Sequence, residues 1–173
     1  MPGIISLAKP LKNADTGRTN QELCKVRAKT IIGWRECVGL PGLGVGAVKA
    51  KIDTGARTSA LHAFDVRRFK KGDEAWVRFT VHPIKRKRRP QVVCEAKFVD
   101  IRNVTSSNGA RERRIFITTQ VQLGPYKFPI ELSLTNRDEM GYRMLLGRQA
   151  LKRRFIVDSG ISYTFGKKEG QVS

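Results

Sequence analysis

Three short runs in the chain place an aspartate before a hydroxyl residue and a glycine. They are Asp15-Thr16-Gly17, Asp53-Thr54-Gly55 and Asp158-Ser159-Gly160. Two carboxylates about 3 Å apart cannot both ionise, so one serves as acid and the other as base on a water held between them. Glycine in the third position lets backbone approach backbone closely at such a pair. Each run could therefore supply one carboxylate of an aspartic peptidase.

The residues that precede each aspartate separate the three runs. Asp53 ends an alternating run, Val48–Ile52, which predicts a strand that carries the carboxylate to its end. Asp15 lies in a polar segment with no strand leading into it. Asp158 also follows apolar residues, Phe155–Val157, so context alone does not exclude it. A second motif is needed to choose between Asp53 and Asp158.

That second motif lies near the C-terminus and comprises Met144–Arg148 with Ala150 and Leu151. It predicts an apolar strand that ends in glycine and a short helix from Arg148 to about Arg154. These elements look like those that close a retropepsin lobe beneath its Asp loop. The motif occurs once, downstream of Asp53 and upstream of Asp158. The chain is therefore expected to hold one lobe with Asp53 as its catalytic carboxylate, and Asp158 to lie in a terminal strand continued by Ile161–Phe165.

Much of the remaining chain alternates apolar and polar residues with the period of two that is typical of half-buried strands. The clearest runs are 76–81, 115–123 and 126–134. Gly124-Pro125 and Asn108-Gly109 predict hairpin turns. These patterns predict a mainly β fold: a retropepsin-like closed barrel, a single lobe, with one short C-terminal helix. The predicted domain covers residues 30–173 and follows a polar, basic, flexible arm over residues 1–29.

The charge of the chain is its most unusual bulk property. The 173 residues include 34 Lys and Arg against 15 Asp and Glu, which gives a net charge of +19 at pH 7. A field of this strength favours polyanionic partners, either nucleic acid or an acidic polypeptide. Solubility with weak, non-specific attraction to RNA would account for the same charge. The charge by itself leaves these alternatives open.

The cysteines and histidines do not form a metal-binding pattern. Cys24, Cys37 and Cys94 are widely spaced, and His62 and His82 are not part of a zinc motif. We expect reduced, mostly buried thiols, no metal and no cofactor. No apolar run approaches the roughly 18 residues that a membrane span needs, and the apolar run at the N-terminus is too short for a secretory signal. A cytoplasmic protein without membrane association is therefore expected.

Five runs of the sequence together carry a family resemblance. They are Trp34–Glu36, Lys51–Ala63, Val77–Pro83, Leu134–Asp138 and Met144–Arg148, within roughly residues 30 to 166. In these runs the chain resembles the retropepsin-like bacterial family of the RimB type, long labelled an ATP-dependent zinc protease. The sequence has neither a zinc motif nor a phosphate-binding loop that would support this older label.

The resemblance implies an aspartic endopeptidase that cleaves glutamate-rich tails. An ATP-grasp glutamate ligase of the RimK type adds such tails to a ribosomal protein, so this ligase and the ribosomal protein are implied partners. One lobe supplies one aspartate, so activity requires a homodimer with Asp53 from each chain. Nucleic acid is expected to bind only non-specifically. A non-catalytic module that binds polyanions or ribosomes is the main alternative, and a metallopeptidase is the third.

The predicted site is centred on Asp53. Thr54 is expected to buttress the loop, and Gly55 to allow a close approach. Ala56 and Arg57 are the adjoining candidates for substrate binding. The Arg57 guanidinium suits bidentate recognition of a substrate glutamate, and an internal ion pair is its alternative role.

A basic loop, Ile84–Pro90, is the predicted flap over the cleft. Its five consecutive cations include Arg86 and Arg88 as candidate substrate-binding residues, because they would attract an acidic chain and help to hold it. A solvated loop, or one that docks on ribosomal RNA through phosphates, is the competing interpretation. The hairpin at Asn108-Gly109 is the alternative flap.

Overall fold

The computed structural model describes residues 29–84, 89–105, 109–137 and 140–166. The chain divides into two compact units, Met1–Thr30 and Ile31–Ser173. The predicted arm over residues 1–29 lies outside the described residues except for Lys29.

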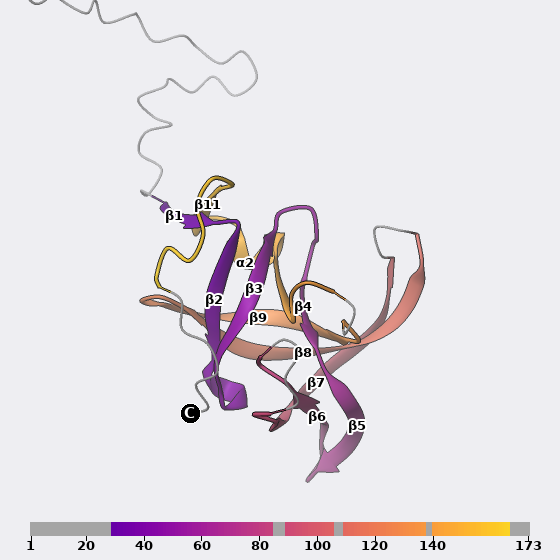
Figure 1. Ribbon diagram of the computed structural model, residues 1–173. Coiled ribbons are helices and arrows are strands. Elements are labelled where there is room, and N and C mark those ends of the chain that lie inside the picture. The colour runs from indigo at the N-terminus through magenta and orange to yellow at the C-terminus, as the bar shows by residue number, and fades with distance from the viewer. Residues whose placement is uncertain (1–28, 85–88, 106–108, 138–139, 167–173) are drawn as a thin grey trace, which may run out of the picture. The chain divides into compact units, whose positions relative to one another are not determined.

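The elements of the second unit are almost all strands (Figure 1). In chain order they are β1 (Thr30–Gly33), β2 (Arg35–Leu40), the 3-10 turn η1 (Pro41–Leu43), β3 (Val45–Asp53), β4 (Ser59–His62), β5 (Phe64–Lys71), β6 (Glu74–Val81), β7 (Val92–Thr105), β8 (Arg111–Leu123), β9 (Tyr126–Thr135), β10 (Met144–Gly147), α2 (Arg148–Leu151) and β11 (Phe155–Asp158). No helix among the described residues is long and apolar enough to cross a membrane.

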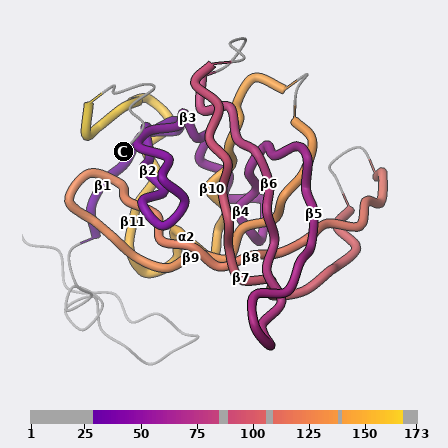
Figure 2. The backbone as a smooth tube through the Cα atoms, turned by 90° about the horizontal axis from the view of Figure 1, so that it is seen from below, coloured from indigo at the N-terminus to yellow at the C-terminus, as the bar shows by residue number. Residues whose placement is uncertain are grey.

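Six of these strands close into a ring in the order β2-β3-β10-β4-β9-β8. The ring closes where Gly39 of β2 pairs with Gln122 of β8. Figure 1 shows β8 and β9 running across β2, β3 and β4, and Figure 2 shows the same strands from below. β7, β6 and β5 extend the sheet beyond β8, while β1 and β11 form a separate two-stranded sheet. The predicted mainly β closed barrel with one short helix is confirmed.

The predicted period-two runs form β6, β8 and β9, and alternate apolar side chains in them are buried. Val77, Phe79 and Val81 of β6 are fully buried, and so are Ile117 and Leu123 of β8. The turn at Gly124-Pro125 joins β8 to β9, with Leu123 opposite Tyr126. Burial of these alternating faces drives formation of the barrel core.

Two predictions near the C-terminus are corrected by the structure. The helix ends at Leu151, not near Arg154, and Arg153 has a φ of 66°, which a right-handed helix does not allow. The terminal strand β11 ends at Asp158, so Ile161–Phe165 does not continue it. That segment hydrogen-bonds instead to the corner between β1 and β2, because tertiary partners there satisfy its backbone.

A buried carboxylate holds this corner. Glu36 is fully buried, and its Oε1 accepts hydrogen bonds from the Gly33 N–H (2.7 Å), the Thr164 N–H (3.1 Å) and the Thr164 hydroxyl (2.7 Å). A buried carboxylate is costly unless donors surround it. Glu36 therefore fixes the path of the chain on both sides of the β1–β2 corner.

The strand β10 lies between β3 and β4 and brings Gly147 beside Asp53. It pairs in parallel with β3, with Gly147 opposite Asp53, and antiparallel with β4. A Cβ on Gly147 would stand 2.4 Å from the Thr58 carbonyl oxygen and 2.9 Å from the Ser59 nitrogen. Only glycine permits this approach of two backbones, and the Gly147 N–H donates to Ser59 Oγ at 3.1 Å.

Replacing Gly147 by alanine should therefore destabilise the fold. Overlap with fixed backbone costs about 2–3 kcal/mol of unfolding free energy, which urea denaturation followed by tryptophan fluorescence measures. Gly141 is a matched control because it is exposed and a Cβ there meets nothing within 4 Å. Gly141→Ala should change stability by less than about 0.5 kcal/mol. Equal urea midpoints for the two variants would contradict the close approach at Gly147.

Candidate active site

Asp53 is the last residue of β3, and its carboxylate is held by the loop that follows. Oδ1 accepts hydrogen bonds from the N–H groups of Gly55 (3.1 Å) and Ala56 (2.9 Å). Oδ2 receives no hydrogen bond from the described residues. The side chain is half-buried. One carboxylate oxygen is thus fixed by the backbone, while the other keeps its capacity to bind water or a second carboxyl group.

The start of α2 supports this loop from beneath. The N–H of Arg148 donates to the Ala56 carbonyl (2.8 Å), and the N–H of Gln149 donates to the Arg57 carbonyl (3.1 Å). The Arg148 guanidinium reaches the carbonyls of Thr54 (3.3 Å) and Gly55 (3.4 Å) through Nη1. The run Met144–Arg148 therefore positions Asp53 by main-chain contact, which is why a glycine and an arginine follow one another there.

The predicted site residues lie together in one loop but differ in what they contact. Thr54 is exposed, and the loop is buttressed by Arg148, not by the Thr54 hydroxyl within its own chain. A Cβ at Gly55 would meet only Asp53 Oδ1 at 3.4 Å, which is ordinary contact. Ala56 is half-buried and binds through its backbone. A single chain therefore gives no steric reason for glycine at position 55.

Arg57 contacts the support beneath the loop through its backbone carbonyl, which accepts the Gln149 N–H. Its side chain is exposed and forms no ion pair with any carboxylate that the structure describes. Arg86 and Arg88 lie outside the described residues, so their predicted role stays a prediction. The segment that holds them joins the antiparallel strands β6 and β7. The strands on either side of the alternative flap, β7 and β8, pair antiparallel up to Thr105 and Arg111, and Asn108 lies outside the described residues.

Asp158 has a local geometry similar to that of Asp53. Its Oδ1 accepts a hydrogen bond from the Gly160 N–H at 2.7 Å. It is exposed at the end of β11, in the two-stranded sheet, and has no counterpart of β10 and α2 beneath it among the described residues. Asp15 lies outside the described residues. Local sequence alone thus reproduces the Asp turn, and only tertiary support distinguishes Asp53.

A basic residue that the sequence prediction did not select lies near Asp53. Arg137 is 8% exposed, and its backbone N–H donates to Nδ1 of the buried His62 at 2.8 Å. The His62 N–H in turn donates to the Arg143 carbonyl at 2.7 Å, so His62 holds both ends of the segment between β9 and β10. Arg137 Nε donates to the Tyr142 carbonyl at 3.2 Å and links the same two ends.

Burial and neighbouring charges shift the pKa of Arg137. Burial lowers the pKa of Arg137 from its ordinary value, the nearby Arg114 lowers it further, and the carboxylate of Asp53 raises it. The guanidinium therefore lies within electrostatic range of Asp53. The run Leu134–Asp138, which carries part of the family resemblance, contained this residue, but sequence spacing gave no sign that it approaches Asp53.

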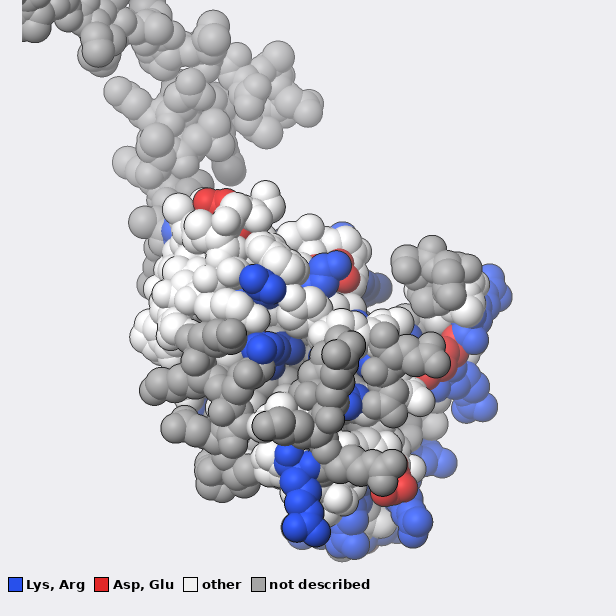
Figure 3. Space-filling view, viewed as in Figure 1, with Lys and Arg blue, Asp and Glu red and all other residues white. Residues whose placement is uncertain are grey.

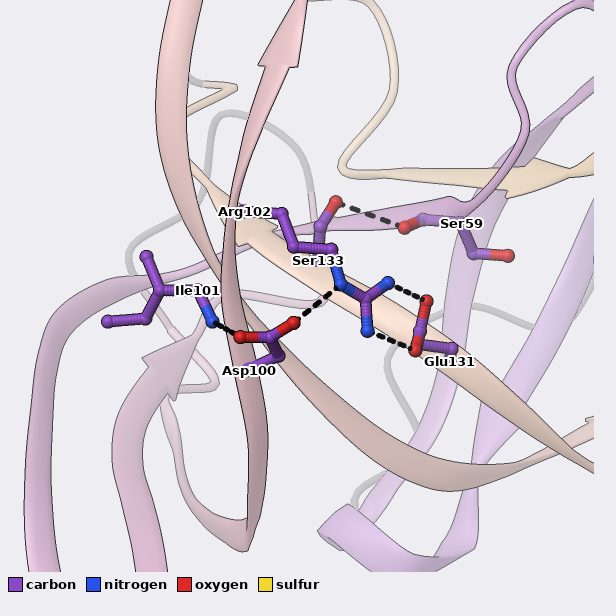
Figure 4. Close-up of polar contacts among 6 residues, drawn as sticks. All are labelled: Ser59, Asp100, Ile101, Arg102, Glu131 and Ser133. Atoms are coloured by element: carbon purple, nitrogen blue, oxygen red, sulfur yellow. Dashed lines mark hydrogen bonds and ion pairs between the residues drawn. The ribbon is translucent and has the colours of Figure 1, made fainter.

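An ion pair spans β8 and links β9 of the ring to β7 (Figure 4). Arg102 of β7 binds Glu131 of β9 through two hydrogen bonds of 2.7 and 2.9 Å and binds Asp100 at 3.0 Å. Two residues further along β9, the Ser133 hydroxyl donates to the Ser59 carbonyl at 3.1 Å. Ser59 Oγ also accepts the Gly147 N–H. Ser59 therefore links β9 to the end of β10 beside Asp53.

The described residues contain no group of three or more His, Cys, Asp and Glu that could hold a metal ion. Cys94 is buried, and its thiol donates to the Leu43 carbonyl at 3.3 Å. Burial raises the pKa of the Cys94 thiol to about 12. A metal ligand must be the thiolate, so the environment of Cys94 suits a structural thiol.

Cys94 should therefore be unreactive in the folded protein at about pH 8. A variant with Cys24→Ser and Cys37→Ser leaves Cys94 as the only thiol. Since a rise of about three pKa units lowers the thiolate fraction roughly 1000-fold, labelling by a thiol-disulfide reagent should be that much slower than in denaturant. The difference should shrink as pH rises toward the folded pKa. Equal rates in the folded and denatured states would refute this assignment.

The closed barrel, the Asp-Thr-Gly loop and the glycine-helix support beneath it define a single retropepsin-like lobe. The chain belongs to the RimB-like family, since residues 31–168 match the family model described as retropepsin-like aspartic endopeptidase RimB. The fold also resembles the crystal structure of a DUF785 protein of unknown function from Legionella pneumophila. That comparison has a TM-score of 0.67 and 27% identity, and covers 80% of this chain and 99% of the other.

Curated relatives share the sequence of this lobe but are much longer. A "Probable alpha-L-glutamate ligase" from Shewanella pealeana is 50% identical over 140 residues, which cover 81% of this chain and 31% of the relative. Proteins with the same description from Desulfotalea psychrophila and Parasynechococcus marenigrum are 43% and 45% identical. This chain thus spans about a third of the length of the curated relatives it matches.

Proposed function

We propose that this protein is an aspartic endopeptidase that acts as a homodimer, with one Asp53 contributed by each chain. The observation that carries the proposal is the Asp53 carboxylate, which the Gly55 and Ala56 N–H groups hold by Oδ1 alone. One lobe provides one such carboxylate. A two-fold axis beside Oδ2 would bring the second into place.

Two features support the two-fold arrangement. Gly55 has no steric requirement for glycine within its own chain, so the close approach that selects it would come from a partner. The two-stranded sheet next to the Asp53 strand exposes Ile31 (51%) and Ile156 (52%). This sheet adjoins the site because the Ile52 N–H donates to the Trp34 carbonyl at 2.9 Å. A short sheet with exposed apolar residues is marginal alone and gains stability from a partner strand.

In the proposed mechanism the two Asp53 carboxyl groups share one proton and titrate as a pair. The ionised member takes a proton from a water held between them, and this water attacks the scissile carbonyl. The protonated member donates to the carbonyl oxygen and stabilises the tetrahedral intermediate. Thr54 of each chain would hydrogen-bond across the dimer axis and hold the loops in register.

We propose glutamate-rich polypeptides as substrates. Arg57 is exposed in the same loop as Asp53, and the buried Arg137 lies within electrostatic range of Asp53. Arg86 and Arg88, in the sequence between β6 and β7, would add to the attraction. We propose that a RimK-type ligase adds such tails to a ribosomal protein in the cytoplasm, and the relatives described as alpha-L-glutamate ligases support the link to glutamate ligation. Cations around a dyad favour acidic side chains by complementarity.

Replacing Asp53 by asparagine should abolish cleavage. An amide cannot serve as the base, so the rate of cleavage of a polyglutamylated ribosomal protein should fall at least about 1000-fold, as followed by mass spectrometry. Asp158→Asn is the matched control, since this aspartate makes the same local turn in the other sheet, and it should retain full activity. Cleavage that survives Asp53→Asn would exclude the dyad.

Replacing Ile156 by aspartate should weaken the dimer. Burying an unpaired carboxylate in an apolar interface costs several kcal/mol, so sedimentation should show monomer and cleavage should be lost at low protein concentration. Val93→Asp is the control, because Val93 is even more exposed (62%) and lies in β7 of the barrel sheet. Dimers that resist Ile156→Asp but dissociate with Val93→Asp would place the interface elsewhere.

A polyanion-binding module is the second candidate function, and the charge distribution favours it. Figure 3 shows Lys and Arg side chains gathered over the β5–β6 hairpin and along β7 and β8. β5 is an edge strand with four exposed cations, Arg67, Arg68, Lys70 and Lys71. Charges on an edge strand also prevent sheet-to-sheet aggregation. Binding of polyglutamate or RNA without cleavage by the wild-type chain would favour this module over the peptidase.

A further inference from the structure

A cavity of about 340 Å³ lies apart from the Asp53 loop and has strongly cationic walls. The described residues that line it include Arg35, Lys49, Arg143, Tyr142, Tyr163 and Pro83, and none of the described lining residues is acidic. Three of these residues are cations, so the charge at the cavity attracts an anion. The lining therefore favours a negatively charged ligand.

Arg35 is held rigidly in this wall. Its guanidinium lies 4.5 Å from the centroid of the Trp34 ring and 5.1 Å from that of Tyr163. Nη1 donates to the Tyr142 hydroxyl at 3.5 Å. Nε is buried and makes no hydrogen bond within the described part of the chain. Stacking fixes the plane of a guanidinium before a ligand binds, which lowers the entropy cost of bidentate recognition.

Tyr163, the lining residue beside Arg35, has a strained backbone conformation. Tyr163 has a φ of 57°, in the left-handed region that a tyrosine seldom adopts. The Tyr163 N–H donates to the Arg35 carbonyl at 2.9 Å, and the Tyr163 carbonyl accepts the Gly166 N–H at 2.9 Å. Strain of this kind persists where surrounding contacts impose it and is concentrated at ligand sites. Here it places the Tyr163 ring against Arg35.

The cavity lies on the side of β3 that carries Asp53. Lys49, Lys51 and Asp53 alternate with the buried residues Ala50 and Ile52, so the three charged side chains share one face. At roughly 3.3 Å per residue, Lys49 lies about 13 Å from Asp53 along the strand. Arg35 belongs to the neighbouring strand and pairs with Lys51. Arg143 directly precedes β10, whose Met144 pairs with Ala50.

We propose that this cavity is a subsite that binds a glutamate carboxylate of the substrate, with Arg35 and Lys49 as its main ligands. The inference rests on the proposed peptidase function and adds a specificity determinant to it. An extended chain bound at Asp53 and running along β3 would place a glutamate roughly two to four residues from the scissile bond at the cavity. The enzyme would then require an acidic chain of that length.

The geometry favours a peptide carboxylate over nucleic acid. Single-stranded nucleic acids bind through aromatic faces on which bases stack. Arg35 already lies over the rings of Trp34 and Tyr163, so these faces are occupied. A carboxylate needs only the guanidinium edge and the lysine ammonium group, and both line the cavity.

Direct binding of a labelled hexaglutamate peptide to the full-length Asp53→Asn chain tests the subsite without turnover. Adding Lys49→Met or Arg35→Gln should raise the dissociation constant at least about tenfold, which is the effect of losing a charge-assisted hydrogen bond. Lys127→Met removes the same charge from an exposed position on β9 and should change it less than about twofold. Binding is measured by fluorescence anisotropy at physiological salt, which screens the long-range attraction of the net charge. A hexaglutamine peptide has no carboxylate side chains, so its dissociation constant should be the same for all variants.

Two outcomes would overturn the subsite: unchanged binding in both cavity variants, or a greater loss for a six-nucleotide oligouridylate than for the peptide. If Arg35→Gln lowers the thermal midpoint, the Lys49→Met result decides, since methionine retains the apolar stem. Cleavage that depends on Asp53 but not on Lys49 would leave the peptidase standing without the subsite. Peptide binding that depends on Lys49 in a wild-type chain that never cleaves would leave the subsite standing without the peptidase.

Discussion

The contact between the backbones at Gly147 and Thr58 is the constraint on which the rest of the site depends. It lets β10 lie between β3 and β4, so that a parallel and an antiparallel pairing meet at the end of the Asp53 strand. A Cβ at position 147 would separate these strands. The N–H groups of Arg148 and Gln149 could then no longer reach the carbonyls of the loop that holds the carboxylate. The geometry of the Asp53 loop follows from main-chain packing, which tolerates less variation than side-chain contacts.

Hydrogen bonds from buried polar residues hold the segments around the Asp53 loop. His62 accepts the Arg137 backbone N–H at its side-chain Nδ1, and its backbone N–H donates to the Arg143 carbonyl, so one buried residue holds both ends of the segment beside the site. Its acceptor role requires that Nδ1 carry no proton. Ser59 likewise joins β9 to Gly147. These links turn three neighbouring strands into a rigid frame for Asp53, which is what preorganised catalysis requires.

The large positive charge is divided among separate structural settings. Exposed cations on β5 protect a sheet edge, while Arg102 and Arg78 form ion pairs with Glu131 and Glu95. Others surround the site: Arg57 at the surface, Arg137 within range of Asp53, and Arg35 and Lys49 in a cavity along the same strand. Net charge therefore overstates the number of cations that could recognise a substrate, and position decides which of them do.

Period-two burial is a local pattern, so the sequence alone predicts the class of fold that the structure confirms. The glycine-helix motif likewise predicted Asp53 over Asp158, although the tertiary support beneath its loop is what distinguishes the two aspartates. The sequence also placed Thr54–Arg57 in one loop. It failed where distant segments meet: Ile161–Phe165 reads as a strand yet hydrogen-bonds to the β1–β2 corner. Arg137 and Arg35 carried no local sign of their roles, since each is defined by partners more than 50 residues away. Only the tertiary structure could decide these, because electrostatic proximity depends on how strands cross and not on spacing along the chain.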